Sequence, residues 1–224
     1  MKIDLHTHTV YGSGCSHLDP SDLVEQAKRI GLDGVCITEH NQLWDPDRIE
    51  KLGRKHDFLV IGGVEVLTDC GEILVYGLHE PVRWVRSAED LREMVDRAGG
   101  IMVAAHPFRG FELKLAHDSP HFPGEGIDVE EGCRLPLLRY VDAIEAFNGW
   151  AYRREWQFTL EVSKRMGLKG TGGSDAHKVL QTGVCYTIFD ETVGNEQDLI
   201  AELKAGRFTP ANCDYGTSPT PPKR

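Results

Sequence analysis

The N-terminal stretch MKIDLHTHTV, residues 1–10, joins a short apolar run to two histidines two positions apart. Residues 2–5 have the length and apolar character of a buried β-strand. Successive side chains of an extended chain point to opposite sides, so His6 and His8 face one side and Thr7 faces the other. The stretch therefore predicts a strand whose end presents two imidazole groups together.

The same pattern of a short apolar run, a polar break and a stretch with helical spacing recurs along the chain. This alternation predicts an α/β fold built on parallel strands. At 224 residues the chain can form one sizeable core, so we expect a single barrel domain over residues 1–210. The expected strands are 2–5, 34–37, 58–63, 73–76, 101–105, 143–147, 168–171 and 184–189.

Helix signals lie between these runs. Asp19 and Pro20 are typical of an N-cap and a first turn, and Gly31 is a typical terminator for the helix that follows. Asp45 and Pro46 repeat the start signal. The spacing of apolar residues predicts further helices at 91–98, 153–166 and 197–205.

Two regions interrupt the pattern. Residues 110–136 form a predicted loop insertion, which is long for a βα loop and contains His117 and His121. An active-site lid and a solvated insertion with surface histidines are both compatible with this composition. The polar, proline-rich residues 211–224 predict a flexible C-terminal tail.

Composition excludes several classes of function. The formal net charge of −10 argues against an extended nucleic-acid surface, which needs many Lys and Arg contacts to phosphates. A small anionic substrate remains compatible, because bound divalent cations reverse the local potential. No secretion signal or membrane-spanning run is recognisable, so we expect a cytoplasmic protein with no membrane partner. The sequence does not indicate an oligomeric state.

Histidines and carboxylates follow the predicted strands. The C-terminal ends of barrel strands meet at one face, so residues far apart in sequence would converge there. A single histidine near a strand is usually a hydrogen-bonded core or surface residue, but a set of ionisable groups is costly to bury unless it is paired or binds metal. Glu65 has two oxygens and can bridge two ions. The expected metal ligands are His6, His8, His40, Glu65, His106, Asp175 and His177.

These motifs, taken in order, resemble the PHP family, named for its polymerase and histidinol phosphatase members. The resemblance implies a distorted (βα)₇ TIM-like barrel with two or three divalent metal ions at the C-terminal face of the strands. His and carboxylate ligands suit zinc, manganese or iron. The matching motifs are DLHTHT at 4–9, TEHN at 38–41, GVEV at 63–66, AHPFRG at 105–110 and GSDAH at 173–177.

The resemblance also assigns the ligands to individual ions. His6, His8, Glu65 and Asp175 would hold the first ion. Glu65 and His106 would hold the second, and His40 and His177 would serve a third.

Three positions depart from the family pattern. The second ion usually has another His or Cys ligand near position 148, where this chain offers Glu145 or Asn148. Glu39 stands where the family commonly has Asp, in a position expected to support the ligands. The third ion often has an Asp or His soon after the first motif, and here the alternatives are Ser13, Cys15 and His17.

The resemblance implies a metal-dependent phosphoesterase that hydrolyses a small phosphomonoester or nucleotide through a metal-bound hydroxide. Arg109, three residues beyond His106, would neutralise the phosphoryl oxygens through its planar fork. His177 would protonate the leaving group.

Two other functions compete with this reading. An amidohydrolase would also begin with the HxH pair, but such enzymes typically bridge their metals with a modified Lys, and here Glu65 holds the plausible bridging position. The third reading is a non-catalytic, metal-binding PHP module. A nearly complete ligand set argues against it, since a structural metal site is normally closed by four ligands around one ion.

Overall fold

The computed structural model of the chain describes residues 1–115 and 126–213. In these residues nine strands form one sheet, in the order β7-β6-β5-β4-β3-β2-β1-β8-β9. The strands are β1 (Lys2–Thr7), β2 (Gly34–His40), β3 (Leu59–Thr68), β4 (Gly71–Tyr76), β5 (Ile101–Ala104), β6 (Ala143–Asn148), β7 (Lys169–Gly173), β8 (Cys185–Phe189) and β9 (Phe208–Asn212).

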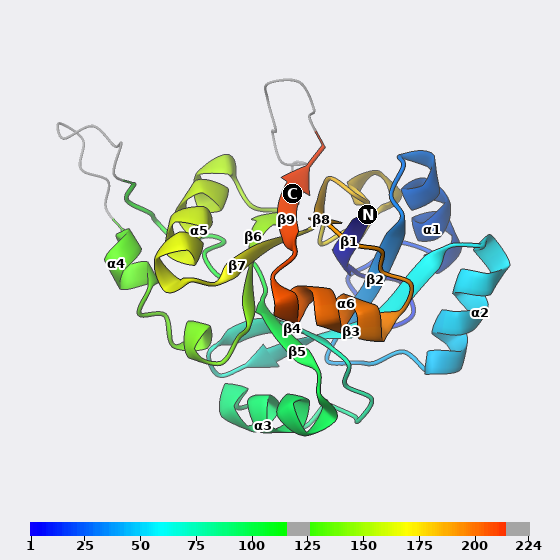
Figure 1. Ribbon diagram of the computed structural model, residues 1–224, viewed down its shortest axis with the longest axis horizontal. Coiled ribbons are helices and arrows are strands. Elements are labelled where there is room, and N and C mark those ends of the chain that lie inside the picture. Colours follow the sequence, from blue (N-terminus) through cyan, green and yellow to red (C-terminus); the bar gives the residue numbers. More distant parts are fainter. Residues whose placement is uncertain (116–125, 214–224) are drawn as a thin grey trace.

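The sheet curls until β1 meets the end of β7. Thr7 and Ala176 form a parallel bridge, and the backbone N–H of His8 donates to the carbonyl of Ala176 at 2.9 Å. The result is a nearly closed barrel with helices around it (Figure 1). The predicted α/β, TIM-like barrel is confirmed.

The expectation of parallel strands throughout is wrong at β4 and β8. β4 pairs antiparallel with both β3 and β5, and β8 pairs antiparallel with β1. Only Asp69 and Cys70 separate β3 from β4, and a parallel crossover needs a dozen or more residues. The hairpin places the start of β4 at the face where the parallel strands end. β9 was not predicted from the sequence, and it crosses the expected domain boundary at residue 210.

The predicted helix starts and stops have the expected capping contacts. The side chain of Asp19 accepts from the N–H of Ser21, and that of Asp45 accepts from the N–H of Asp47. Gly99 ends its helix in the left-handed conformation. The helices are α1 (Pro20–Arg29), α2 (Pro46–His56), α3 (Ala88–Ala98), α4 (Val129–Gly132), α5 (Arg153–Met166) and α6 (Glu196–Ala205), with 3₁₀ turns at Pro136–Arg139 and Val179–Gln181.

The helices surround the barrel unevenly. α1 and α2 pack on each other on one flank, and α5 lies on the opposite flank (Figure 1). Leu199 and Leu203 of α6 join a buried cluster with Ile3, Tyr76 and Val103 from the strands. Tyr76 ends the antiparallel strand β4, so α6 closes the end of the barrel away from the parallel strand ends. Functional groups are therefore left to the other face.

The predicted insertion at 110–136 contains structure of its own. Leu113 and Ile127 form a parallel bridge, and α4 follows with a capping box at Asp128 and Glu131. His117 and His121 lie outside the described residues, as does the tail beyond residue 213. None of the helices in residues 1–115 and 126–213 has the length and apolar character needed to cross a bilayer.

Candidate metal centre

The carboxylate of Glu65 lies at the centre of the histidine cluster. Glu65 is inside β3, not after it as the sequence suggested, and its side chain is 1% exposed. Its Oε1 lies 3.1 Å from His106 Nε2 and 3.4 Å from His6 Nε2. Its Oε2 lies 2.7 Å from His40 Nδ1 and 3.4 Å from His8 Nε2. One buried carboxylate thus has four imidazoles around it, from the ends of β1 and β2 and from the loop after β5.

Asp175 closes the cluster from the loop after β7. Its Oδ1 lies 3.3 Å from His8 Nε2 and 3.6 Å from His6 Nε2, and His177 Nδ1 is also 3.6 Å away. Asp175 has a φ of 53°, so this segment is not the extended chain that the alternation argument assumed. The structure nevertheless brings all seven predicted ligand residues into one cluster.

The donor atoms of this cluster fit a divalent cation. The Nε2 atoms of His6 and His8 lie 3.0 Å apart and converge on the same carboxylates. Glu65 Oε2 is buried, and among the described residues nothing donates a hydrogen bond to it with acceptable geometry, although His40 Nδ1 is close. A buried polar atom without a partner needs an explanation, and an ion held by imidazole and carboxylate groups supplies one.

The pKa values of the clustered side chains also favour the replacement of a bound proton by a metal cation. Burial lowers the pKa of His6, but the carboxylates of Glu145, Asp175 and Glu65 together raise that pKa well above its ordinary value. Burial lowers the pKa of His8 to about 4, so its ring is neutral at pH 7. Burial raises the pKa of Glu65, yet the charge of His6 and the imidazole hydrogen bonds hold it well below its usual range. A cation can replace the proton of His6 in this ionised set.

Glu145 and Asn148 support the ligands. Glu145 Oε1 lies 3.0 Å from His6 Nδ1, and its Oε2 accepts from the backbone N–H of His106 at 2.9 Å and from Asn148 Nδ2 at 3.0 Å. Asn148 Oδ1 accepts from the N–H of Trp150 at 2.9 Å. The oxygens of Glu145 are thus occupied by contacts that fix His6 and His106, and the oxygen of Asn148 is occupied by a backbone N–H. Glu145 nevertheless lies near enough to His6 and His106 to belong to a possible metal-binding group.

Glu72 is the residue of this cluster that the sequence reasoning missed. Its Oε2 lies 3.6 Å from His106 Nε2, and it forms a group with His40 and Glu65 whose ligand atoms all lie within 4.8 Å of one another. Glu72 reaches this face because β4 is antiparallel and begins where the parallel strands end. The signal was the short interval between the expected strands 58–63 and 73–76, because residues 64–72 are too few for a parallel crossover.

The three residues considered as ligands of the third ion, Ser13, Cys15 and His17, differ in burial and in their contacts with the cluster. Ser13 is buried, and its Oγ lies 3.0 Å from His8 Nδ1, on the side of that ring away from Glu65. Cys15 and His17 are exposed. Partial burial raises the pKa of the Cys15 thiol, and the charges of nearby carboxylates raise it further. The remaining metal-binding group is formed by imidazoles alone, from His8, His40 and His177.

The two predicted catalytic residues lie at the rim of the cluster. Arg109 Nη1 lies 2.5 Å from Asp175 Oδ2, and Arg109 Nη2 lies 3.9 Å from Glu72 Oε2, with a third of the side chain exposed. His177 Nδ1 lies 2.9 Å from the carbonyl oxygen of Asp175, which leaves its Nε2 as the other functional atom. A cation and an imidazole thus border the mouth of the cluster.

Two protein-family models match this chain. The model of the PHP domain matches residues 4–180, and a model described as PHP-associated matches residues 155–208. The chain belongs to the PHP domain family. The site described above therefore lies within a PHP domain, at the strand ends that carry its histidine motifs.

One sequence relative and two solved structures are similar to this PHP domain. An uncharacterized protein of Methanocaldococcus jannaschii is 32% identical over 118 residues, which cover 48% of this chain and 68% of that protein. The crystal structure of PsfC from Pseudomonas syringae is 20% identical with a TM-score of 0.62, covering 94% and 91% of the two chains. A two-domain protein from Bacteroides vulgatus, containing a predicted PHP-like metal-dependent phosphoesterase, is 20% identical with a TM-score of 0.63, covering 95% and 64%.

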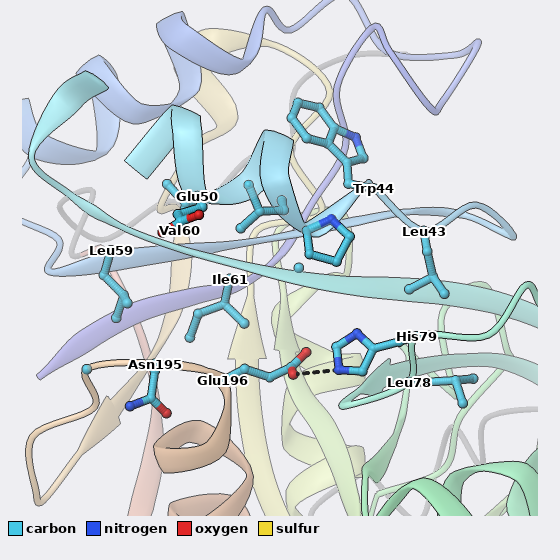
Figure 2. A pocket seen from close by; sticks show the side chains of 14 residues that line it. Leu43, Trp44, Glu50, Leu59, Val60, Ile61, Leu78, His79, Asn195 and Glu196 are labelled. Carbon is cyan, nitrogen blue, oxygen red and sulfur yellow. Dashed lines mark ion pairs between the residues drawn. The ribbon is translucent and has the colours of Figure 1, made fainter. Parts of the chain in front are cut away.

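A groove of about 710 Å³ leads away from the metal-binding face of the PHP domain at His40. It runs between residues 40–46, which connect β2 to α2, and residues 79–83, which follow β4. Trp44 and His79 also line an adjoining apolar pocket of about 270 Å³ on the barrel flank, where His79 pairs with Glu196 at 3.1 Å (Figure 2). The sequence analysis considered the 110–136 insertion as an active-site lid and did not foresee this groove.

Proposed function

We propose that this PHP domain is a metal-dependent phosphoesterase that hydrolyses a small phosphomonoester or nucleotide. The observation that carries the proposal is the buried Glu65 carboxylate, which four imidazole nitrogens approach within 2.7–3.4 Å. A bridging carboxylate among histidines is the arrangement that hydrolytic sites with two metal ions require.

The chain offers ligands for two or three ions. The groups overlap, because Glu65 is shared between the first two and His8 lies between the first and the third. The divalent ions supply a water that is acidic enough to ionise near neutral pH and a positive charge against the phosphoryl oxygens. We assign His6, His8, Glu65 and Asp175 to the first ion, and His40 and His177, beside His8, to the third. We assign Glu65, His106 and Glu72 to the second, because His106 Nε2 lies 3.1 Å from Glu65 Oε1 and 3.6 Å from Glu72 Oε2.

Arg109 and His177 have separate roles in this proposal. Arg109 contacts two carboxylates that are also assigned to the ions, so ion binding would release its planar fork toward non-bridging phosphate oxygens. His177 is 16% exposed, and its backbone-bound Nδ1 leaves Nε2 available at the rim. An imidazole at that point can give a proton to the leaving oxygen when no ion occupies it.

The groove at His40 gives the non-reacting part of the substrate a place to bind. Trp44, Pro46 and Pro81 offer flat apolar surfaces along it. Arg83 also lines the groove, and in the described part of the chain its guanidinium pairs with no carboxylate and lies over the ring of Trp84. We propose that Arg83 recognises a second anionic group of the substrate.

The two alternatives fit the structure less well. No lysine takes part in the ion pairs of the cluster within residues 1–115 and 126–213, and Glu65 holds the bridging position, which disfavours an amidohydrolase with a modified Lys. A non-catalytic module would not need Arg109 at the mouth of an open site or a groove beside it.

The test combines metal analysis with a substrate panel. The purified protein, loaded with Mn²⁺ or Zn²⁺, should turn over at least one compound from a panel of phosphomonoesters, phosphodiesters and nucleotides. Asp175→Ala should abolish that turnover, whereas the matched surface change Asp96→Ala should preserve it. Bound metal without turnover of any phosphoester would support the non-catalytic module, and a protein that binds no metal would refute the proposal.

Arg83 is tested with the substrates that this panel identifies. Arg83→Gln should raise KM about tenfold for substrates with a second anionic group and leave kcat/KM for p-nitrophenyl phosphate within twofold, because a hydrogen bond to a charged group contributes about 1.5 kcal/mol. An equal effect on both substrates would contradict the assigned role.

A further inference from the structure

A buried carboxylate that is not one of the seven predicted ligands lies behind His8. Glu39 is fully buried near the end of β2, on the strand position before His40. Its Oε2 accepts from the hydroxyl of Ser13 at 2.5 Å and from the backbone N–H of Thr9 at 3.0 Å. Its Oε1 accepts from the indole N–H of Trp44 at 3.0 Å and from the hydroxyl of Thr9. Because both oxygens are occupied by donors, Glu39 is not itself a metal ligand.

Ser13 connects this carboxylate to His8. The hydroxyl proton of Ser13 is directed to Glu39, so Ser13 Oγ has only its lone pairs to offer to other groups. His8 Nδ1 lies 3.0 Å from that oxygen and must therefore be the protonated nitrogen that donates to it. The backbone N–H of His40 donates to the same oxygen at 3.3 Å. The tautomer of His8 then places its other nitrogen, Nε2, without a proton toward Glu65 and Asp175.

We propose that Glu39 and Ser13 form a relay that holds His8 in the orientation and tautomer needed to bind metal. Ser13 is a positioning residue in this account, in the place where the sequence left a third-ion ligand open. The inference rests on the proposed function, because it assigns His8 as a metal ligand. It also links the two departures from the family pattern at positions 13 and 39, because both residues act on His8 through one hydrogen-bond chain.

Gly12 makes room for the longer carboxylate. A Cβ at this position would overlap the Cβ, Cγ and Cδ atoms of Glu39. Gly12 precedes Ser13, so the same short turn both admits the Glu39 side chain and supplies its hydroxyl partner. The indole of Trp44 fixes the other oxygen and links the relay to the groove that begins at His40.

The test measures metal affinity and the state of His8 in the full chain. Dissociation constants for Zn²⁺ would be obtained by chelator competition for the unaltered protein, Ser13→Ala, Glu39→Gln and Gly12→Ala. Groups that orient a metal ligand typically contribute 10- to 100-fold in affinity, so each variant should weaken Zn²⁺ binding by about that factor. The matched control is Ser163→Ala, which removes a buried serine of α5 whose hydroxyl donates to the carbonyl of Leu168, just beyond the end of that helix.

Two further readouts separate positioning from a merely structural effect. Long-range ¹H–¹⁵N NMR of the zinc-loaded protein should show His8 protonated at Nδ1, and this proton should exchange faster in Ser13→Ala. The double variant Ser13→Ala, Glu39→Gln should bind Zn²⁺ no more weakly than the worse single variant, because both changes act on His8 through one path. Folding of each variant would be checked by circular dichroism.

The possible failures are distinguishable. An unaltered protein that binds no Zn²⁺ would overturn the proposed function and the relay with it. An unaltered protein that binds Zn²⁺ while the single variants bind it within twofold, or a double variant whose effects add fully, would overturn the relay alone.

Discussion

The ends of β1 and β7 deliver the same kind of ligands by different backbone geometry. At β1, His6 lies in the strand and His8 directly after its end, and their Nε2 atoms converge to 3.0 Å although the pairing of β1 with β2 is irregular between Asp4 and Thr7. The two-residue spacing is therefore itself the structural information. After β7, Asp175 takes a left-handed φ of 53°, and its contact with His8 depends on the bridge between Thr7 and Ala176. A ligand on a strand is thus set by local geometry, whereas a ligand on the following turn is set by closure of the barrel.

The largest effect on metal content and activity should come from a substitution of Glu65, which lies on strand β3 at the centre of the site. Glu65→Gln removes the charge that four imidazoles approach, and we expect the loss of at least one bound ion and a fall in kcat/KM of more than about 100-fold, beyond the effect typical of groups that only support a ligand. Elemental analysis and kinetics would check this. Unchanged metal content would contradict the role of Glu65 as a carboxylate shared by two ions.

A smaller effect is expected for Glu72, which the β3–β4 hairpin brings to the metal-binding face. Glu72→Gln should weaken binding of the second ion by about 10- to 100-fold while the first ion stays bound, because Glu72 Oε2 lies 3.6 Å from His106 Nε2 and Glu72 is not among the residues assigned to the first ion. The matched control Glu50→Gln changes an exposed glutamate that pairs with Arg54. Stoichiometry from titration calorimetry would decide, and simultaneous loss of both ions would contradict the division into two groups.

Protonation offers a test that needs no mutation. The pKa of His6 is raised in the metal-free protein by Glu145, Asp175 and Glu65 despite burial, so His6 carries a proton that an incoming cation must displace. Metal affinity should therefore rise with pH, by about tenfold per pH unit for each proton released. Calorimetry in buffers of different ionisation enthalpy would count the protons. Affinity that is constant between pH 6 and 8 would contradict a protonated His6.

The smallest expected effect concerns a turn next to a ligand. Asn41 follows His40 with a φ of 54°, and its Oδ1 accepts from the N–H of Leu67 at 3.1 Å. Asn41→Val should reduce the free energy of unfolding of the metal-free protein by about 1–2 kcal/mol, since β-branched residues disfavour the left-handed region. Asn41→Asp retains the acceptor and tolerates this conformation, and should change it by less than about 0.5 kcal/mol. Equal unfolding midpoints in urea for both variants would refute the reasoning.

The sequence predicted what depends on local spacing. The barrel, most of its strands and helices, and the clustering of the seven residues predicted as ligands follow from apolar periodicity and from the tendency of barrel strand ends to converge. Strand direction was missed at β4, and Glu72 was missed with it, because a hairpin reverses the face at which a strand begins. The left-handed backbone at His106 and Asp175 depends on tertiary contacts, and no local pattern marks it.

The supporting network was the least predictable part of the site. Glu145 was expected as a possible ligand, but it lies on the Nδ1 side of His6, and Ser13 lies in the same relation to His8. Which side of a ring a residue faces depends on how neighbouring strands are staggered, and residue types alone do not encode this. The supporting roles of Glu145 and Ser13 follow only from their hydrogen-bond partners in the folded protein.

The most direct test of the central claim is an anomalous-scattering map from crystals of the protein grown with Mn²⁺ or Zn²⁺, recorded at the metal's absorption edge. We predict one ion bound by His6, His8, Glu65 and Asp175 and a second near Glu65 and His106, with ligand distances of roughly 2.0–2.3 Å. A map with no ion within bonding distance of Glu65 would contradict the account.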